Sequence, residues 1–435
     1  MKSAMQGQPS RNLRVILWLL IVLAGAEFVV RGPVRYLRER SNWNDLSQNY
    51  TAAKLWLQGE SPSDPANFVT LWKQEGHSRL NITDIRTHMA PPLGGLVVLA
   101  PVAALPWRTA RVVWIVLLMI SVGATIWALA RAAGLGSNLG STNNLRTLTF
   151  IAACLALAPF QTDLASGNTS VLVIALCALA IWAARSQRDT TAAVLFGAAC
   201  AVKPQLGAFL VLYYLVQRRW RLFTMAVATT LALNLIAIVR LRGTSWVQDY
   251  LHNARGFVSD NPIDDFTTAN PARFALINLQ VPFFSITGSA KSANWLSFGV
   301  VFILVCVWIY WVIRNGEHVP EFLALGAISA VALLPVYHRF YDASLLAIPL
   351  CWCILSAARE AKLHSRLALL LMLPFLFPGS AFLQQLAVRG TIPNSWTNSW
   401  LWKCVLVPHE TWAILLLSLV LIYAMKASSS RRQNV

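Results

Sequence analysis

Runs of about 20 apolar residues recur along the whole chain, and no other feature restricts the fold as strongly. Apolar residues make up 56% of the 435 positions and charged residues only 12%, whereas a soluble domain carries about 25% charged residues. An apolar α-helix of this length crosses a bilayer with every backbone hydrogen bond satisfied. The sequence therefore predicts an all-α polytopic membrane protein with about 11–12 transmembrane helices.

The order of apolar spans and basic clusters predicts how the chain is oriented. Basic residues precede the first span and cluster around 359–366 and 426–432, and such clusters stay in the cytoplasm. We therefore expect a single integral membrane domain with both termini inside and two large loops, 32–92 and 241–293, outside. The first span lacks a small-residue cleavage site and should be retained. Spans are expected at about 14–31, 111–131, 146–165, 168–185, 222–240, 295–313, 321–337, 341–358, 366–382 and 410–426.

Composition also excludes several classes of function. The net charge is +18, but the basic residues lie in short clusters between apolar runs, which indicates contacts with membrane lipids and not with nucleic acid. The seven cysteines form no CxxC pair, and the seven histidines show no paired-ligand spacing. The sequence thus predicts no disulfide framework, no metal site and no cofactor.

Two apolar segments do not read as ordinary spans. The run from Leu93 to Leu105 contains Pro101 and is too short to cross a bilayer, so a re-entrant or surface-lying segment is expected. The stretch 190–217 is interrupted by Lys203 and Pro204 and has arginines at both ends. It forms either a hairpin of two short helices with Lys203 at its tip, which the basic flanks favour, or a single crossing with Lys203 in mid-bilayer.

The first outer loop contains a predicted amphipathic helix within residues 41–62. Apolar residues recur there every three or four positions, and Gly59 and Pro62 end the pattern. Asp45 lies at the start of this helix, beside Asn44. A carboxylate at a bilayer surface can act as a general base, but Asp is also a common helix cap, and the segment alone leaves both readings open. The predicted apolar stripe is Leu46, Tyr50, Ala53 and Leu57, and the nearby amides are Gln48 and Asn49.

Three further polar places adjoin the spans, and ionisable residues there are functional hypotheses by default. They are Lys203 before its proline, the segment 334–342 with His338 and Arg339, and the turn 162–168 with Asp163. In the expected topology all three open to the same face as Asp45. The alternatives are that His338 and Arg339 snorkel to lipid head groups, that Lys203 caps a kinked helix, and that Asp163 is an interfacial charge.

Together these segments resemble a known family. In order they read DxxxNYxAAxLWLxGxxP, a Pro-Pro pair before a short apolar run, a Gly-amide turn, GAACAVKPQLGAFLVLYYLVQRRWR and LLPVYHRFYD. Over residues 40–350 this order is similar to the polyprenyl-phosphate-dependent glycosyltransferases of the GT-C fold. Within them it resembles glycosyltransferase family 87, which includes the phosphatidylinositol-mannoside mannosyltransferases. The chain departs from the family pattern at Asn168, where Gln is common, and at Ala90, where Tyr is common.

The resemblance implies an inverting glycosyltransferase in the cell membrane, active at its extracytoplasmic face. The donor would be a polyprenyl-phosphate-linked sugar, with mannose as the first candidate, and the acceptor would be a lipid or a glycan. Asp45 matches the catalytic base, Lys203 the lysine of the Lys-Pro motif, and His338 the histidine before the late outer turn. Lys203, His338 and Arg339 are expected to bind the donor phosphate, and the pocket candidates are Gln48, Asn49, Asn168 and Tyr341.

The expected chemistry is coherent on general grounds. The acceptor hydroxyl loses its proton as it attacks the anomeric carbon, and one carboxylate suffices because phosphate is a good leaving group. A single base opposite the leaving group gives inversion. Cationic side chains can neutralise the growing phosphate charge, so no metal is required. Should Asp45 not be the base, Asp163 and Asp342 are the reserve candidates.

Other classes of function compete with this one. A transporter or flippase of lipid-linked sugars would also need charges within the membrane, but the chain lacks the internal repeat of many transporters. The hypothesis of a membrane scaffold without chemistry does not explain the interruption at Lys203 and Pro204. The sequence does not decide between mannose, glucose and arabinose, and it does not identify the acceptor.

Overall fold

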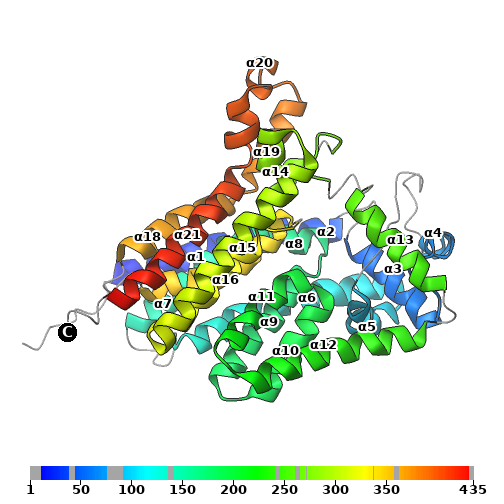
Figure 1. Ribbon diagram of the computed structural model, residues 1–435, viewed down its shortest axis with the longest axis horizontal. Coiled ribbons are helices and arrows are strands. Elements are labelled where there is room, and N and C mark those ends of the chain that lie inside the picture. Colours follow the sequence, from blue (N-terminus) through cyan, green and yellow to red (C-terminus); the bar gives the residue numbers. More distant parts are fainter. Residues whose placement is uncertain are drawn as a thin grey trace, which may run out of the picture.

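The computed structural model describes residues 11–38, 45–75, 92–135, 142–241, 245–259, 265–270, 272–336, 338–356 and 362–430. These residues are almost entirely helical (Figure 1). The β-type pairing found among them is one isolated antiparallel bridge between Leu276 and Arg339. The predicted all-α fold is therefore confirmed.

The described helices occur along the chain in the following order. The first half of the chain forms α1 (Arg11–Val29), η1 (Val30–Val34), α2 (Arg35–Arg38), α3 (Asp45–Gln58), α4 (Pro65–Gln74), α5 (Leu93–Ala103), α6 (Trp107–Ala132), α7 (Thr142–Ala156), α8 (Ala158–Ser166), α9 (Ser170–Arg185), α10 (Asp189–Val202) and α11 (Pro204–Val216). The second half forms α12 (Trp220–Arg240), α13 (Ser245–Ser259), η3 (Arg273–Ala275), α14 (Gln280–Thr287), α15 (Ala290–Asn315), η4 (Gly316–His318), α16 (Glu321–Ala332), η5 (Phe340–Leu346), α17 (Ala347–Ser356), α18 (Lys362–Met372), η6 (Leu373–Leu376), α19 (Gly379–Val388), α20 (Asn394–Thr397), η7 (Trp402–Leu406) and α21 (His409–Ser430).

Five of the described helices are long and apolar enough to cross a membrane: Asn12–Arg38, Trp107–Ala132, Trp220–Arg240, Ala290–Asn315 and His409–Ser428. Two more spans form if each of two bent helix pairs crosses as one unit. Six shorter apolar helices complete the bundle, and one of them, α16, is buried on nearly every face. The chain is thus a multi-pass membrane protein whose long helices enclose shorter ones.

Two spans that the sequence analysis expected to be continuous are bent. The span expected at 146–165 turns by 47° between α7 and α8, next to Pro159. The span expected at 366–382 turns by 40° between η6 and α19, at Pro378. Proline removes a helical hydrogen bond and displaces the preceding turn. Conversely, the first span runs on past residue 31 to Arg38, because a π-helical turn accommodates Pro33.

The stretch 190–217 forms the predicted hairpin. Its two arms, α10 and α11, meet at Lys203, and Phe196 packs against Tyr214 across the hairpin. At the open end Arg219 forms an ion pair with Asp189, so both flanks lie on the same side. The alternative of a single crossing is therefore wrong.

The short helix α5 lies inside the bundle, against α3, α10 and α12. Most of its residues are buried, so it is not surface-lying, and at 11 residues it is too short to cross a membrane. Gly94 and Gly95 let it approach the end of α10. A Cβ atom at Gly94 would lie 3.0 Å from the Cβ of Ala201, and one at Gly95 would lie 3.5 Å from the Cα of Val202. This close contact fixes the position of the hairpin tip.

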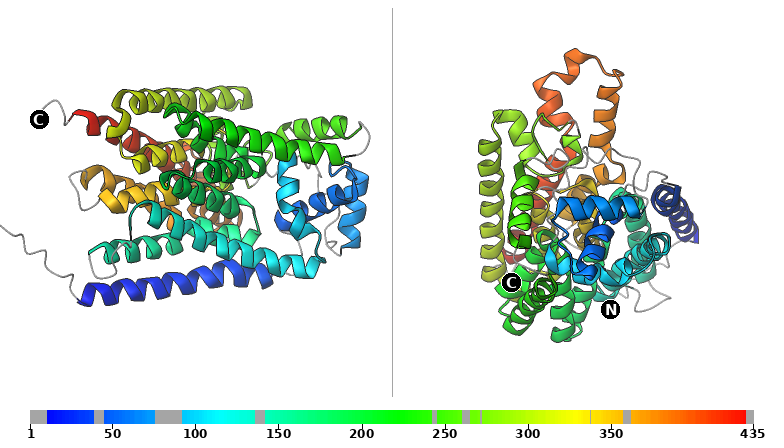
Figure 2. Two further views of the ribbon diagram at one scale, coloured as in Figure 1. Left: turned by 90° about the horizontal axis from the view of Figure 1, so that it is seen from below. Right: turned by 90° about the vertical axis from the view of Figure 1, so that its right-hand side faces the viewer.

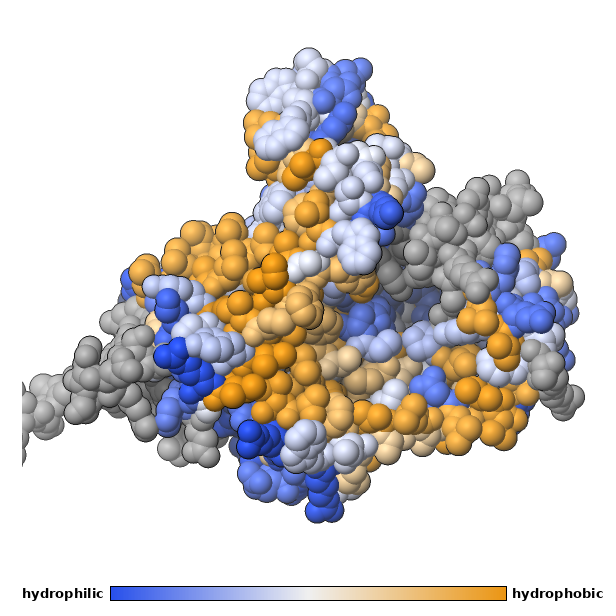
Figure 3. All heavy atoms as spheres, viewed as in Figure 1, coloured by the Kyte–Doolittle hydropathy of each residue, from blue (hydrophilic) through white to orange (hydrophobic). Residues whose placement is uncertain are grey.

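The long helices run side by side, and the amphipathic helices lie at one end of the bundle (Figure 2). Helix α1 begins and helix α21 ends at the opposite end from α3 and α4. Helices α14, α19 and α20 form an arm that projects from the body (Figure 1). Between the arm and the lobe of α3, α4 and α13, the surface is hollowed, with hydrophilic residues inside and apolar residues on much of the rim (Figure 3).

Candidate functional site

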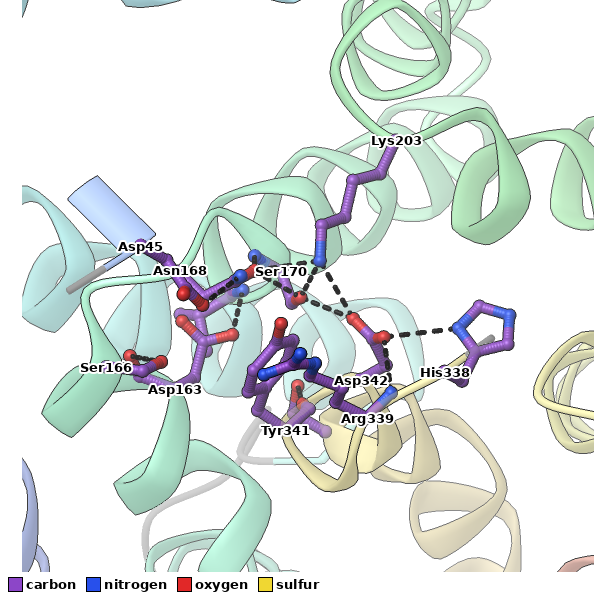
Figure 4. A network of polar contacts seen from close by, with 12 residues as sticks. Asp45, Asp163, Ser166, Asn168, Ser170, Lys203, His338, Arg339, Tyr341 and Asp342 are labelled. Carbon is purple, nitrogen blue, oxygen red and sulfur yellow. Dashed lines mark hydrogen bonds and ion pairs between the residues drawn. The ribbon is translucent and has the colours of Figure 1, made fainter. Parts of the chain in front are cut away.

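Four segments that are far apart in the sequence bring their polar residues together at the end of the bundle near α3 (Figure 4). They are the start of α3, the turn between α8 and α9, the tip of the α10–α11 hairpin, and the η5 turn. Each is an interruption or an end of a helix, where backbone and side-chain polar groups are not used up by the helix itself. The result is a hydrogen-bonded network within an apolar bundle.

The start of α3 presents Asp45. The predicted amphipathic helix is confirmed: Leu46, Tyr50 and Ala53 are buried, Leu57 is half-buried, and Gly59 ends the helix with a φ of 80°. The Asp45 carboxylate accepts a hydrogen bond from the Asn168 amide, with 2.6 Å between Oδ2 and Nδ2. Among the described residues, no backbone N–H of the first turn donates to this carboxylate. Its contact is with the turn between α8 and α9, which is distant in the sequence.

The turn between α8 and α9 holds the Asn168 amide in place. Gly167 adopts a left-handed conformation (φ 68°), and a Cβ atom there would lie 2.7 Å from the ring of Tyr36. Glycine is therefore required both by the backbone and by the close contact. The Asn168 Oδ1 accepts hydrogen bonds from the Ser170 N–H (3.0 Å) and from Lys203 Nζ (2.8 Å). One amide thus joins a carboxylate at its nitrogen to a cation at its oxygen.

Lys203 lies at the hairpin tip, in an extended conformation between two helices (φ −141°, ψ 86°). Its ammonium group contacts Asn168 Oδ1, Ser170 Oγ (2.6 Å) and Asp342 Oδ1 (3.0 Å), which uses all three of its donors. The ring of Tyr341 lies 5.0 Å from Nζ. The side chain is only 14% exposed, so the charge is held in a largely dry environment.

Asp342 has both carboxylate oxygens occupied. Oδ1 lies 3.0 Å from Lys203 Nζ and accepts a hydrogen bond from the Ser170 hydroxyl at 2.5 Å. Oδ2 accepts from the Arg339 N–H at 3.1 Å and lies 3.2 Å from His338 Nδ1. The Asp342 side chain is 2% exposed and both of its oxygens have partners. It is therefore a poor candidate for a general base.

The two other carboxylates of the site differ sharply in access. Asp163 is fully buried; its Oδ2 accepts from the Val171 N–H at 3.0 Å, while its Oδ1 has no hydrogen-bond partner in the described part of the chain. Asp45 is only partly buried, and among the described residues its Oδ1 accepts no hydrogen bond. Of the three carboxylates, Asp45 is thus the one that can meet an incoming substrate.

The remaining predicted residues fall into two groups. His338 lies on the side of Asp342 away from Lys203 and is fully buried, and its Nε2 has no hydrogen-bond partner among the described residues. Arg339 and Tyr341 lie beside the network, and the bridge to Leu276 fixes the backbone of Arg339. Gln48 and Asn49 lie further along α3, half-buried, and do not join the network within the described part of the chain. The predictions for Asn44, Ala90, Pro91 and Tyr337 concern residues outside the described ranges.

Sequence reasoning gave Ser170 no role, and it named Asp342 only as a reserve base. Ser170 is fully buried and contacts Asn168, Lys203 and Asp342. The available signal was its place in the first turn of α9, directly after a Gly-amide turn. That position is typical of polar residues that bind helix-end groups, but it does not say which distant side chain they meet.

A comparison with protein families matches part of the sequence to a class of enzymes. The model of glycosyltransferase family 87 matches residues 91–336, more than half of the chain. The chain belongs to glycosyltransferase family 87. Among curated proteins, no sequence matches it. The matched segment contains Asn168 and Lys203, whereas Asp45 and the turn with His338 and Asp342 lie outside it.

Membership of family 87 makes the protein a glycosyltransferase, which uses a sugar donor and an acceptor. The apolar bundle makes it a multi-pass membrane enzyme. The resemblance drawn from the sequence to this family is therefore confirmed. The roles of individual residues rest on the geometry of the network, since the match stops short of Asp45 on one side and of His338 on the other.

Proposed function

We propose that this family 87 glycosyltransferase moves a sugar from a polyprenyl-phosphate donor to a lipid or glycan acceptor, with mannose as the first candidate for the sugar. The transfer inverts the anomeric configuration and takes place on the extracytoplasmic face of the cell membrane. The observation that carries the proposal is the bridge through Asn168, which holds a partly accessible carboxylate and a buried ammonium group at the two ends of one amide. In transfer of a sugar from a phosphate leaving group, the carboxylate can accept the proton of the acceptor and the ammonium group can bind the phosphate. Both can act together because they lie close to each other without forming an ion pair.

In this proposal Asp45 is the general base. The acceptor hydroxyl attacks the anomeric carbon, its proton passes to a carboxylate oxygen of Asp45, and the bond between that carbon and the phosphate oxygen breaks. The contact with Asn168 orients the carboxylate and leaves Oδ1 for the acceptor. One base on the face opposite the leaving group produces inversion.

Lys203 is the proposed contact of the leaving phosphate, with Arg339 beside it. Because all three donors of Lys203 are occupied, the phosphate must replace one of its present partners. Asp342 can release the ammonium at least cost, because its other oxygen still binds the Arg339 N–H and lies within reach of His338. In this account His338 supports Asp342, and its contact with the phosphate, expected from the resemblance, requires the turn 338–342 to move.

The direct test supplies the purified protein with labelled polyprenyl-phosphate-mannose and extracted membrane lipids. The expected result is a labelled lipid or glycan product with inverted anomeric configuration. Parallel reactions with glucose and arabinose donors identify the sugar. Movement of the donor across reconstituted vesicles without transfer would replace this proposal with the flippase alternative.

The orientation has its own test. We expect a single cysteine at Lys73, which is exposed on α4, to react with an impermeant reagent in intact cells. A cysteine at Arg218, exposed at the open end of the hairpin, should react only after the membrane is opened. The reverse pattern would place the site on the cytoplasmic face.

A further inference from the structure

Three arginines at the end of the first span line a cavity on the surface of the protein. Arg31, Arg35 and Arg38 recur at spacings of four and three residues and therefore share one face of the helix. With Val30 and Val34 they line a cavity of about 320 Å³. Arg31 also lies over the ring of Phe377, 5.6 Å from its centroid, where the arm begins.

Within the described residues, most of the positive charge of this cluster has no acidic partner. Arg31 forms an exposed ion pair with Glu27, at 2.8 Å. Arg35 and Arg38 are exposed and form no ion pair or hydrogen bond with the described residues. In the orientation proposed above, the cluster lies at the outer end of α1, whereas arginines normally gather at the cytoplasmic end. These exposed charges are available to an anionic ligand.

The surface below the cavity is apolar and faces outward. Helix α1 and the first residue of η1 expose large side chains, each between 44% and 66% exposed: Trp18, Leu19, Val22, Leu23, Val29 and Val30. Cations above an apolar, uncovered helix face match an amphiphile with an anionic head and hydrocarbon chains. Free phosphate would make no use of the apolar part.

The cluster is also connected to the candidate site. Tyr36, between Arg35 and Arg38, is fully buried and packs on Gly167, the residue before Asn168. The carbonyl of Tyr36 accepts a hydrogen bond from the Arg111 side chain at 3.2 Å. Since Tyr36 points inward while its neighbours point outward, the cluster and the Asn168 bridge lie on two sides of one helical turn.

We propose that Arg31, Arg35 and Arg38 bind the head-group phosphate of an anionic phospholipid whose acyl chains lie along the exposed face of α1. The leaflet depends on the orientation proposed above, but the binding does not. The bound lipid holds the turn of Tyr36 against Gly167, and so supports the position of the Asn168 amide.

The test measures binding of fluorescent phosphatidylglycerol to the full-length protein in a neutral detergent. Arg35→Gln/Arg38→Gln should weaken binding about 30-fold, the factor that about 1 kcal/mol per surface charge gives for two charges. Arg35→Lys/Arg38→Lys should keep most of the affinity. The matched control is Arg131→Gln/Arg218→Gln, which removes two exposed charges elsewhere and should leave binding unchanged.

Competition identifies the ligand. Phosphatidylglycerol should displace the probe, while phosphatidylcholine with the same chains and inorganic phosphate should displace it poorly. Equal affinity in the Arg35→Gln/Arg38→Gln variant and the control would overturn the site. Equal competition by phosphatidylcholine would show that the head-group charge plays no part, and equal competition by inorganic phosphate would show an anion site without lipid; either result overturns the proposal. Thermal unfolding of each variant checks that it is folded, and the binding assay is independent of sugar transfer.

Discussion

The two ends of the bundle carry similar ion pairs in different surroundings. At the open end of the hairpin, Arg185 pairs with Glu321 at 2.5 Å and Arg219 pairs with Asp189, with side chains 19–40% exposed. At the hairpin tip, Lys203 and Asp342 are 14% and 2% exposed. Exposed pairs contribute little to stability, whereas buried charges are costly unless fully paired.

This difference in burial indicates which end of the bundle holds the functional site. The pairs at the open end simply join neighbouring helices at a solvated edge. The tip, in contrast, gathers three carboxylates, a lysine and a buried histidine within an apolar bundle. One oxygen of Asp163 and one nitrogen of His338 have no hydrogen-bond partner among the described residues. Burying these ionisable groups in an apolar bundle costs free energy, and such groups usually belong to a functional site. Substitutions at the two ends should therefore differ in size and in kind.

The largest effect is expected at Asp45. Asp45→Asn keeps the size of the side chain and its contact with Asn168, so fold and donor binding should be retained. Turnover should fall about 10²–10⁴-fold, the usual contribution of a positioned base. Initial rates with a labelled donor, at saturating donor and acceptor, provide the measurement.

Asp45→Ala is the companion variant. If the residue were only a helix cap, Asn would be tolerated, Ala would be less stable, and activity would follow the amount of folded protein. Near-normal turnover of Asp45→Asn would remove the base from α3. The search would then return to Asp163 and Asp342, both of which are buried.

A large effect on stability is expected at Asp342. Asp342→Ala leaves Lys203 and Ser170 without their shared partner, and loss of one member of a buried pair costs about 3–5 kcal/mol. Asp189→Ala, which breaks the exposed pair with Arg219, is the matched control and should cost less than about 1 kcal/mol. Thermal unfolding in detergent measures both. Equal losses would erase the distinction between the two ends.

A moderate effect on the donor is expected at Lys203. Lys203→Ala removes one charge-assisted contact with the phosphate, worth about 1.5–3 kcal/mol of donor binding. Lys203→Ala also breaks the buried pair with Asp342, so it should lower stability as Asp342→Ala does. Because Asp342 keeps its contacts with Ser170 and the Arg339 backbone, the rates are compared per amount of folded protein. The dependence of the rate on donor concentration is measured beside that of Lys203→Arg, which keeps the charge. Unchanged donor dependence with normal activity would make Lys203 a structural residue.

The smallest effect is expected at the open end. A double-mutant cycle of Arg185→Gln and Glu321→Gln should give a coupling energy of about 0.2–1 kcal/mol. Donor and acceptor kinetics should stay unchanged, because the pair lies at the end of α11 opposite Lys203. A coupling well above this range, or a changed rate, would show that the open end communicates with the site.

The sequence by itself determined the helices and their class. Apolar runs identified the five long spans because a helix in lipid must satisfy its backbone internally. The spans expected at 168–185, 321–337 and 341–358 are shorter apolar helices in the described structure. The three- and four-residue spacing identified α3, and the interruption at Pro204 together with the basic flanks identified the hairpin. These features are local, since each depends on residues within a few turns of one another.

Only the tertiary structure decided which of these features meet. Asp45 contacts Asn168 across 123 positions of the chain, and Ser170 contacts Asp342 across 172. It also decided which carboxylate is accessible, since Asp45, Asp163 and Asp342 look alike in sequence but differ in burial and in hydrogen bonds. The same holds for His338, which lies on the side of Asp342 away from Lys203 and is fully buried. Burial and pairing arise from the packing of helices that are distant in the sequence. Hydropathy along the chain does not indicate which helix faces pack together.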